Sequence, residues 1–392
     1  MQRWTGIHWK TGRAVEIGVL SGRIEYVVDT NMPHADVWIA PALIDLQVNG
    51  IHGVNYNDAG TTVEDIGRSV RYLHSCGVAR FCPTVTSCSQ KEALSRLDLL
   101  ARACEADPVT DYAILGIHVE GPYLSAEDGP RGMHAPQVMR DPDWNEFLAW
   151  ESAAKGRLRK VTVAPERKGA IEFIRQLAER GIIAAIGHTS ATDEQIEEAV
   201  EAGATMSTHL GNGAHPVLKR HPNYIWAQLG EDRLWAGLIA DGFHLPPSTL
   251  KSMIRAKGGK AILVSDTNML EGAPPGTYNY GVNEVVKDAE GRLFVAATPD
   301  IFAGSALALH VGVGNIVRFG IASVSEAIEM ASTHPAELLG LAHEGAGSLS
   351  AGAPADFILY DSGESGGFRV LETVSQGVSR YRNPSASKED SR

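Results

Sequence analysis

Residues 113–122, AILGIHVEGP, form an apolar run that ends in a carboxylate, Glu120, followed by glycine and proline. Three later stretches show the same pattern, in which apolar residues lead to an imidazole or a carboxylate near the end. They are GIIAAIGHTS (181–190) with His188, ATMSTHL (204–210) with His209 and KAILVSDTN (260–268) with Asp266. Short apolar runs bounded by turn residues are typical of buried strands. Catalytic residues of a parallel barrel come from the C-terminal ends of several strands. We therefore expect these four side chains to meet at one mouth.

Strand-like and helix-like runs alternate from Pro41 onward. The eight strand candidates are 42–50, 79–87, 113–121, 159–166, 181–190, 204–210, 235–242 and 260–268. Helix-like stretches with apolar residues three and four apart lie between them, at 62–77, 91–107, 169–181 and 191–203. Eight alternations predict a (β/α)₈ TIM-type barrel. A doubly wound open sheet is the alternative, but it would place its ligand at a switch point and would not explain functional endings on four strands.

Bulk composition narrows the class of protein. With 392 residues, 44% hydrophobic and 21% charged, the chain suits one barrel plus a smaller satellite. No tract approaches the roughly 18–20 apolar residues of a membrane span, and a net charge of −12 argues against a nucleic-acid partner. The first 15 residues lack the apolar core of a secretory signal, and the four cysteines form no CxxC pair. We expect a cytoplasmic protein with no membrane partner.

The two ends of the chain differ from its centre. Residues 1–40 and 347–382 read as short alternating strands with glycine turns, which predicts one small β-sandwich built from both ends. The barrel would occupy residues 41–346, and the Gly- and Pro-rich insert at 272–303 would add a hairpin or a lid. Residues 383–392 have nothing to bury, so we expect a disordered tail.

Seven motifs occur in one order along the chain: DLQVNG (45–50), HVEGPYL (118–124), GHTSAT (187–192), THLGN (208–212), ADGFH (240–244), VSDT (264–267) and FAGSAL (302–307). Together they resemble the N-acetylglucosamine-6-phosphate deacetylase family of the amidohydrolase superfamily. The likeness extends to HPAELLGL (334–341) and GSLSAGAPADFILYD (347–361). The reaction that this resemblance implies converts N-acetylglucosamine 6-phosphate and water to glucosamine 6-phosphate and acetate.

The resemblance implies a role for each strand-end residue. Glu120, His188 and His209 would hold one divalent metal ion, with water as the fourth ligand. A metal ion can lower the pKa of bound water to about 7. Asp266 would take a proton from that water and later pass it to the departing amine. Two imidazoles with a carboxylate are a recognised catalytic zinc set, so we expect Zn²⁺, although iron, manganese and cobalt accept the same ligands.

Substrate contacts follow from the same resemblance. His244, after ADGF, would contact the acyl oxygen or a sugar hydroxyl. His134, in PRGMHAPQ, would also touch the substrate. The backbone of Ala303, Gly304 and Ser305 would meet the sugar ring.

The first strand predicts the number of metal ions. Many amidohydrolases carry histidine–x–histidine there and bind two metals, whereas this chain reads Gln47–Val48–Asn49. Neutral amides are poor zinc ligands beside imidazole and thiolate. A single metal site is therefore expected, as in the mononuclear branch of the superfamily.

The phosphate-handling segment departs from the family pattern. The family usually reads HLxNAM and then a basic residue that reaches in from the neighbouring subunit of a dimer, whereas this chain reads HLGNGAHPVLKRHPNYIW (209–226). Asn212 and Gly213 would still offer donors to a phosphate, with charge from Lys219, Arg220 and His221. We expect Arg220 to matter most, from its own or a partner subunit of a homodimer, because its planar fork suits two phosphate oxygens. The alternative is a solvated basic loop.

Three other functions stay open on the sequence alone. The same chemistry could act on an unphosphorylated or differently configured N-acetylhexosamine, or on a non-sugar N-acyl substrate. A non-catalytic barrel that serves as a scaffold would be expected to have lost its ligands, whereas all four strand-end residues are present.

Overall fold

The computed structural model describes residues 1–31, 37–362 and 367–384 of the chain. Its centre is an eight-stranded parallel sheet whose strands neighbour one another in chain order: β5 (Leu43–Val48), β8 (Val78–Thr86), β9 (Ile117–Glu120), β10 (Leu158–Val163), β11 (Ile183–Ile186), β12 (Ala204–Ser207), β13 (Trp235–Ile239) and β14 (Ala261–Val264). The circle closes where Asn49 N donates to Thr267 O at 2.8 Å and Asp266 N donates to Gln47 O at 3.0 Å. The predicted (β/α)₈ barrel is confirmed, with every strand where its apolar run lies.

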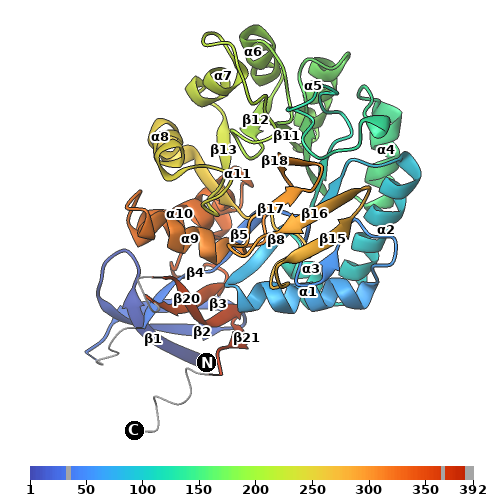
Figure 1. Ribbon diagram of the computed structural model, residues 1–392. Helices are drawn as coiled ribbons and strands as arrows, with labels where there is room; N and C mark the ends of the chain where they lie inside the picture. The colour runs from blue at the N-terminus through green and yellow to red at the C-terminus, as the bar shows by residue number, and fades with distance from the viewer. Residues whose placement is uncertain (32–36, 363–366, 385–392) are drawn as a thin grey trace.

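Helices surround this barrel (Figure 1). They are α1 (Val63–Ser75), α2 (Gln90–Ala106), α3 (Pro108–Ala113), α4 (Trp144–Ala153), α5 (Ala170–Glu179), α6 (Asp193–Glu201), α7 (Tyr224–Gly230), α8 (Pro247–Lys257), α9 (Leu309–Arg318), α10 (Val324–Ala331) and α11 (Thr333–Leu338), with 3₁₀ turns η1 (Pro136–Val138), η2 (Gly258–Lys260) and η3 (Ala342–Glu344). The four predicted helices are confirmed as α1, α2, α5 and α6. The sequence sets their starts: Thr62 and Asp65 form a capping box at α1, which satisfies backbone donors that the helix leaves open.

Both ends of the chain enter a second sheet, as predicted. Its seven strands are β1 (Gln2–His8), β2 (Ala14–Leu20), β3 (Arg23–Asp29), β4 (Trp38–Pro41), β19 (Phe357–Asp361), β20 (Arg369–Ser375) and β21 (Val378–Arg382). The two ends join where β19 pairs antiparallel with β4, with Phe357 opposite Pro41. All seven strands hydrogen-bond as one continuous sheet, which lies beside the barrel (Figure 1). The predicted tail at 383–392 falls mostly outside the described residues; Asn383 N still donates to Leu371 O at 2.7 Å.

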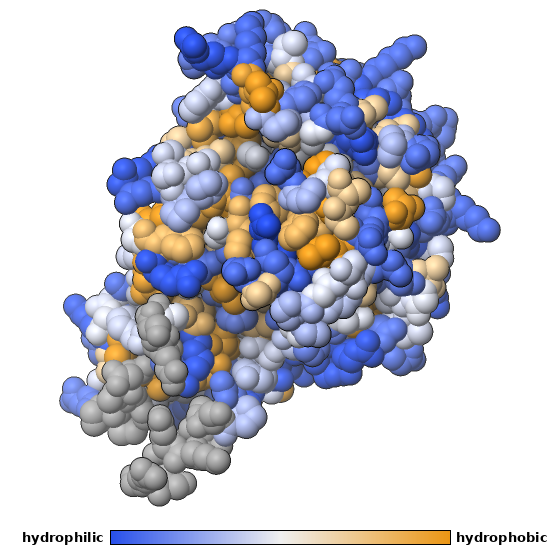
Figure 2. All heavy atoms as spheres, viewed as in Figure 1, coloured by the Kyte–Doolittle hydropathy of each residue, from blue (hydrophilic) through white to orange (hydrophobic). Residues whose placement is uncertain are grey.

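A third sheet follows β14. The insert folds as four antiparallel strands: β15 (Gly276–Tyr280), β16 (Asn283–Lys287), β17 (Leu293–Val295) and β18 (Thr298–Phe302). A two-stranded hairpin, β6 (Gly50–Ile51) with β7 (Val54–Asn55), follows β5. The view of Figure 2 shows apolar side chains gathered across the middle of this face, where the insert overlaps the barrel.

The barrel interior is filled rather than open. Ile44, Ile183, Met206 and Ile262 belong to one buried apolar cluster inside it, which also includes Ala336 of α11 and Leu339 directly after that helix. Side chains therefore close the lower part of the barrel, and the polar residues are left at the C-terminal ends of the strands. Among the described residues, no helix is long and apolar enough to cross a membrane.

Candidate active site at the barrel mouth

Four parallel strands deliver the predicted residues to one place. Glu120 is the last residue of β9, and His188, His209 and Asp266 each follow the end of their strand by two residues. The last three adopt positive φ angles of 51°, 28° and 50°. Such angles are uncommon outside glycine, cost of order 1–3 kcal/mol each and cluster at functional sites. The local backbone is therefore bent where the side chains must turn inward.

Glu120, His188 and His209 form a compact triangle. The Glu120 Oε1 to His209 Nε2 distance is 2.9 Å, His188 Nε2 to His209 Nε2 is 3.1 Å, and His188 Nε2 to Glu120 Oε1 is 3.4 Å. Ligands about 2.0–2.1 Å from a tetrahedral zinc ion are about 3.3 Å apart. The donor set and its spacing therefore fit one divalent ion.

The electrostatic surroundings of Glu120 keep its side chain in the form that can bind a metal ion. The Glu120 side chain is almost fully buried. Burial opposes its ionisation, but hydrogen bonds and charge from His188 and His209 outweigh it and hold the pKa of Glu120 well below its ordinary value. The carboxyl group is thus a carboxylate, the form that binds a cation.

Asp266 faces the same centre from the opposite side of the barrel. Its Oδ1 accepts from Asn49 Nδ2 at 2.7 Å and from Gln47 Nε2 at 3.1 Å, and Gln47 Nε2 also lies 3.0 Å from Glu120 Oε1. Burial and the charge of Glu120 raise the pKa of Asp266. A carboxyl group whose proton affinity is raised in this way suits proton transfer. Gln47 and Asn49 thus orient carboxylates through their amides.

A loop after β9 supports His188. Pro130 O lies 2.7 Å from His188 Nδ1, so this nitrogen donates to the carbonyl and Nε2 is left for the centre. Gly132 and Gly213 pack against the same ring; a Cβ at Gly213 would fall 2.5 Å from Nδ1. Gly213, in the NGAHP segment, is therefore required for steric reasons, because the backbone there passes too close to the His188 ring to leave room for a side chain.

His134 comes from that loop. Its ring lies 4.5 Å from the His188 ring, nearly perpendicular to it. One ligand atom each from Glu120, His134 and His188 lie within 4.8 Å of one another. Burial and the neighbouring His188 lower the pKa of His134 to about 3, so the imidazole is neutral at physiological pH. The structure thus brings His134 to the centre, and its contact with the substrate stays a prediction.

His244 is held by a residue that the sequence analysis did not single out. Asp241 Oδ2 accepts from His244 Nδ1 at 2.7 Å, and Asp241 Oδ1 accepts from the backbone N–H of His244 at 3.0 Å. The charge of His244 and these hydrogen bonds outweigh burial and lower the pKa of Asp241. Because Nδ1 is engaged, Nε2 is left to contact a substrate. The D-G-F-H spacing was the available signal, since an Asp often bonds backbone two or three residues ahead.

Residues 303–305 run alongside Asp266. Ser305 N donates to Asp266 O at 2.9 Å, and Asn268 Nδ2 donates to Ala303 O at 2.7 Å. Gly304 has a φ of 69°, and a Cβ there would lie 2.9 Å from Asp266 O. The three predicted sugar-contacting residues are thus brought to the mouth, with Asn268 as a support that sequence reasoning missed.

The predicted phosphate-binding loop, residues 212–221, has fewer contacts with the residues at the barrel mouth. Asn212 Nδ2 donates to the His209 carbonyl at 3.2 Å, which places this residue beside the triangle. Lys219, Arg220 and His221 are exposed. Within the described part of the chain, the Arg220 side chain forms no hydrogen bond or ion pair, so no such contact ties it to the residues at the mouth of its own barrel.

A polar belt lies one layer below the centre. His118 Nε2 lies 2.8 Å from Thr162 Oγ1, which lies 2.8 Å from Thr208 Oγ1, and His118 Nδ1 lies 3.1 Å from Thr84 Oγ1. Burial lowers the pKa of His118 well below its ordinary value. His118 is therefore a neutral, hydrogen-bonded core residue that packs beneath Glu120, the placement expected from its position two residues earlier.

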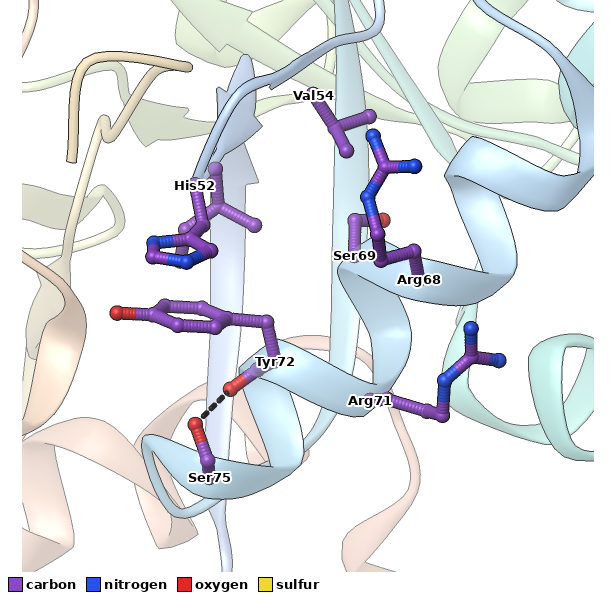
Figure 3. Close-up of a pocket in the computed structure, with 8 residues that line it drawn as sticks. His52, Val54, Arg68, Ser69, Arg71, Tyr72 and Ser75 are labelled. Carbon is purple, nitrogen blue, oxygen red and sulfur yellow. Dashed lines mark hydrogen bonds between the residues drawn. The ribbon is translucent and has the colours of Figure 1, made fainter. Parts of the chain in front are cut away.

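A separate cavity of about 290 Å³ lies between the β6–β7 hairpin and α1 (Figure 3). The rings of His52 and Tyr72 stack there, with centroids 3.9 Å apart, and Tyr72 Oη donates to Glu271 Oε1 at 3.1 Å. None of the predicted site residues lines this cavity. It is therefore not the reaction site, but Glu271 ties it to the chain segment that follows β14.

Comparisons with known proteins agree with this geometry. Residues 38–385 match the Amidohydrolase family. An N-acetylglucosamine-6-phosphate deacetylase from Danio rerio is 34% identical over 82% of this chain and 80% of its own length, and an N-acetylgalactosamine-6-phosphate deacetylase from Escherichia coli O157:H7 is 31% identical over 83% and 84%. A mutant N-acetyl-D-glucosamine-6-phosphate deacetylase from Mycobacterium smegmatis, solved with N-acetyl-D-glucosamine-6-phosphate, superimposes with a TM-score of 0.83 at 30% identity, covering 94% of this chain and 95% of that chain.

Proposed function

This chain belongs to the amidohydrolase family and, within it, to the N-acetylglucosamine-6-phosphate deacetylases, and we propose that its barrel mouth carries out that reaction. The enzyme hydrolyses the amide C–N bond of N-acetylglucosamine 6-phosphate, giving glucosamine 6-phosphate and acetate. The observation that carries this assignment is the buried triangle of Glu120, His188 and His209 with Asp266 beside it.

The triangle would hold a single divalent ion, and we favour Zn²⁺ for its carboxylate and two imidazoles. When bound, such an ion polarises a carbonyl and lowers the pKa of water. Gln47 and Asn49 occupy the place of a second ligand pair, but their amide N–H groups donate to Glu120 and Asp266. One ion per chain follows from that arrangement.

The residues of the chain then handle the protons. Asp266 takes a proton from the attacking water and delivers it to the sugar nitrogen as the C–N bond breaks. His244, fixed by Asp241 through Nδ1, offers Nε2 to the acyl oxygen or to a sugar hydroxyl. His134, neutral beside His188, contacts the substrate from the β9 loop.

The sugar and its phosphate would meet two further segments. The backbone of Ala303, Gly304 and Ser305 borders the ring, and Asn212 and Gly213 offer donors to the phosphate. Because Arg220 is exposed and unpaired within the described residues, we assign it to the site of a partner subunit in a homodimer. Four free, buried cysteines suit a reducing compartment, and we propose the cytoplasm.

A panel of four sugars tests the substrate. Acetate release should be compared for N-acetylglucosamine and N-acetylgalactosamine, each with and without a 6-phosphate. We expect the highest kcat/KM for N-acetylglucosamine 6-phosphate. Equal rates with and without phosphate would replace this substrate with an unphosphorylated N-acetylhexosamine, and a preference for the galacto sugar would move the chain toward the E. coli relative, which shares 31% identity.

A further inference from the structure

We propose that Asn283, at the tip of the β15–β16 hairpin, is a positioning residue for this reaction: it holds the loop of residues 130–134 over the centre. The proposal rests on the proposed function, because it concerns how His134 and His188 are placed for that chemistry. Asn283 does not touch the centre itself. It acts through the backbone of Met133.

The 130–134 loop brings two groups to the centre within five residues. Pro130 O accepts from His188 Nδ1 at 2.7 Å and so fixes which nitrogen of that ring faces the centre. Four residues later, the His134 ring lies 4.5 Å from the His188 ring. A shift of this loop would therefore move both the Pro130 carbonyl that orients His188 and the side chain of His134.

The loop has few contacts of its own. It contains no helix or strand between Glu120 and Pro136. Inside it, Arg131 Nη1 donates to His134 O at 2.9 Å and Gly132 N donates to Gly129 O at 2.9 Å. These bonds shape the turn, and the bond from His188 to Pro130 O attaches its first residue to the barrel. None of these bonds holds the carbonyl of Met133, so that part of the loop takes its position from a partner outside the loop.

The insert supplies that partner. Asn283 Nδ2 donates to Met133 O at 3.0 Å, and Met133 directly precedes His134 in the loop. The Met133 side chain packs against a small apolar cluster formed by Leu270, Val285, Leu293, Ala303 and Ala306. The hydrogen bond and this packing attach the loop to the insert from one side.

The insert is itself attached to residues 270–273, the segment directly before its first strand. Lys287 Nζ, on the strand that begins with Asn283, donates to Leu270 O at 3.0 Å and to Ala273 O at 2.8 Å. The rings of His52 and Tyr72 stack (Figure 3). Both side chains contact Glu271: Tyr72 Oη donates to Glu271 Oε1 at 3.1 Å, and His52 Nδ1 lies 3.5 Å from Glu271 Oε2. These anchors belong to the segment that follows β14 and Asp266. Asn283 therefore connects the β9 side of the site, which carries ligands, to the β14 side, which carries the proton-transfer residue.

The sharpest variant is Asn283→Asp, because it keeps the shape of the side chain and replaces only the donating N–H with an oxygen that faces a carbonyl. Asn279→Asp is the matched control: it lies on β15 of the same hairpin, is exposed, and introduces the same charge. We expect kcat/KM for deacetylation to fall roughly 5- to 30-fold in Asn283→Asp, as for the loss of one partly buried hydrogen bond, and to stay near wild type in the control.

Two further readouts separate positioning from a general loss of structure. Hydrogen exchange of the amides in residues 128–135 of the purified holoenzyme should be faster in Asn283→Asp than in wild type, with unchanged exchange in the barrel strands. In a His134→Ala background the same substitution should cost much less than in wild type, because one of its effects is already removed. Unchanged loop exchange, or a full additive loss of activity in that background, would overturn the proposal. Hydrogen exchange needs no substrate, so it decides the question even if deacetylation of the proposed sugar fails.

Discussion

Lys160 lies inside the barrel, and its replacement should stabilise the protein. The residue is on β10, is 1% exposed, and its Nζ has no hydrogen-bond partner among the described residues. Burial lowers its pKa from 10.5 to about 8. The charged form is therefore disfavoured in the folded state, and Lys160→Met, which keeps most of the aliphatic chain, removes that cost.

The magnitude follows from the two pKa values. At pH 7 the side chain is protonated in both states, and a lowering from 10.5 to about 8 corresponds to about 3 kcal/mol at 1.36 kcal/mol per unit. The penalty is fully present below pH 8 and disappears as the pH passes 10.5, because both states are then neutral. At pH 9.5 about 1.4 kcal/mol should remain by the same relation.

Denaturant midpoints of wild type and Lys160→Met at pH 7 and pH 9.5 measure this difference. Lys168→Met is the control, since Lys168 is exposed and should give little change at either pH. A gain that is absent at pH 7, or that does not shrink at pH 9.5, would refute the claim that an uncompensated ammonium group is buried in the barrel.

Three further predictions concern the mouth. Asp266→Asn should keep the fold and the metal while lowering turnover by roughly 10²–10⁴-fold, as the loss of general acid–base catalysis does; rapid turnover with metal bound would remove Asp266 from the mechanism. Elemental analysis should find one divalent ion per chain, with little left in His209→Ala, whereas two ions would contradict the role given to Gln47 and Asn49. Arg220→Ala should lower kcat/KM roughly 10–150-fold for the phosphorylated sugar alone, from about 1.5–3 kcal/mol of charge-assisted bonding; an equal loss on the unphosphorylated sugar would exclude a phosphate contact.

The sequence was sufficient for the barrel and its mouth because both depend on local patterns. An apolar run bounded by turn residues specifies a strand, and the residue at its end specifies what reaches the C-terminal face. Glu120, His188, His209 and Asp266 could therefore be placed together before any contact was known. The steric role of Gly213 beside His188 could not, because it depends on how closely two loops approach.

Contacts between distant loops were beyond the sequence. Asn283 and Met133 are 150 residues apart, and nothing near either one indicates the other. The insert at 272–303 was expected as a hairpin or lid, and only the structure gives four strands anchored through Lys287. Lys160 was also missed, because a lysine on a strand gives no local sign that its ammonium group will be enclosed.

Metal dependence of acetate release tests the central claim most directly. Purified protein should be depleted with a chelator, assayed with N-acetylglucosamine 6-phosphate, and then titrated with Zn²⁺. We predict that depletion abolishes acetate release and that one equivalent of Zn²⁺ per chain restores it, with no recovery in His188→Ala. Full activity in the depleted protein, or recovery that requires two equivalents, would contradict a single ion held by Glu120, His188 and His209.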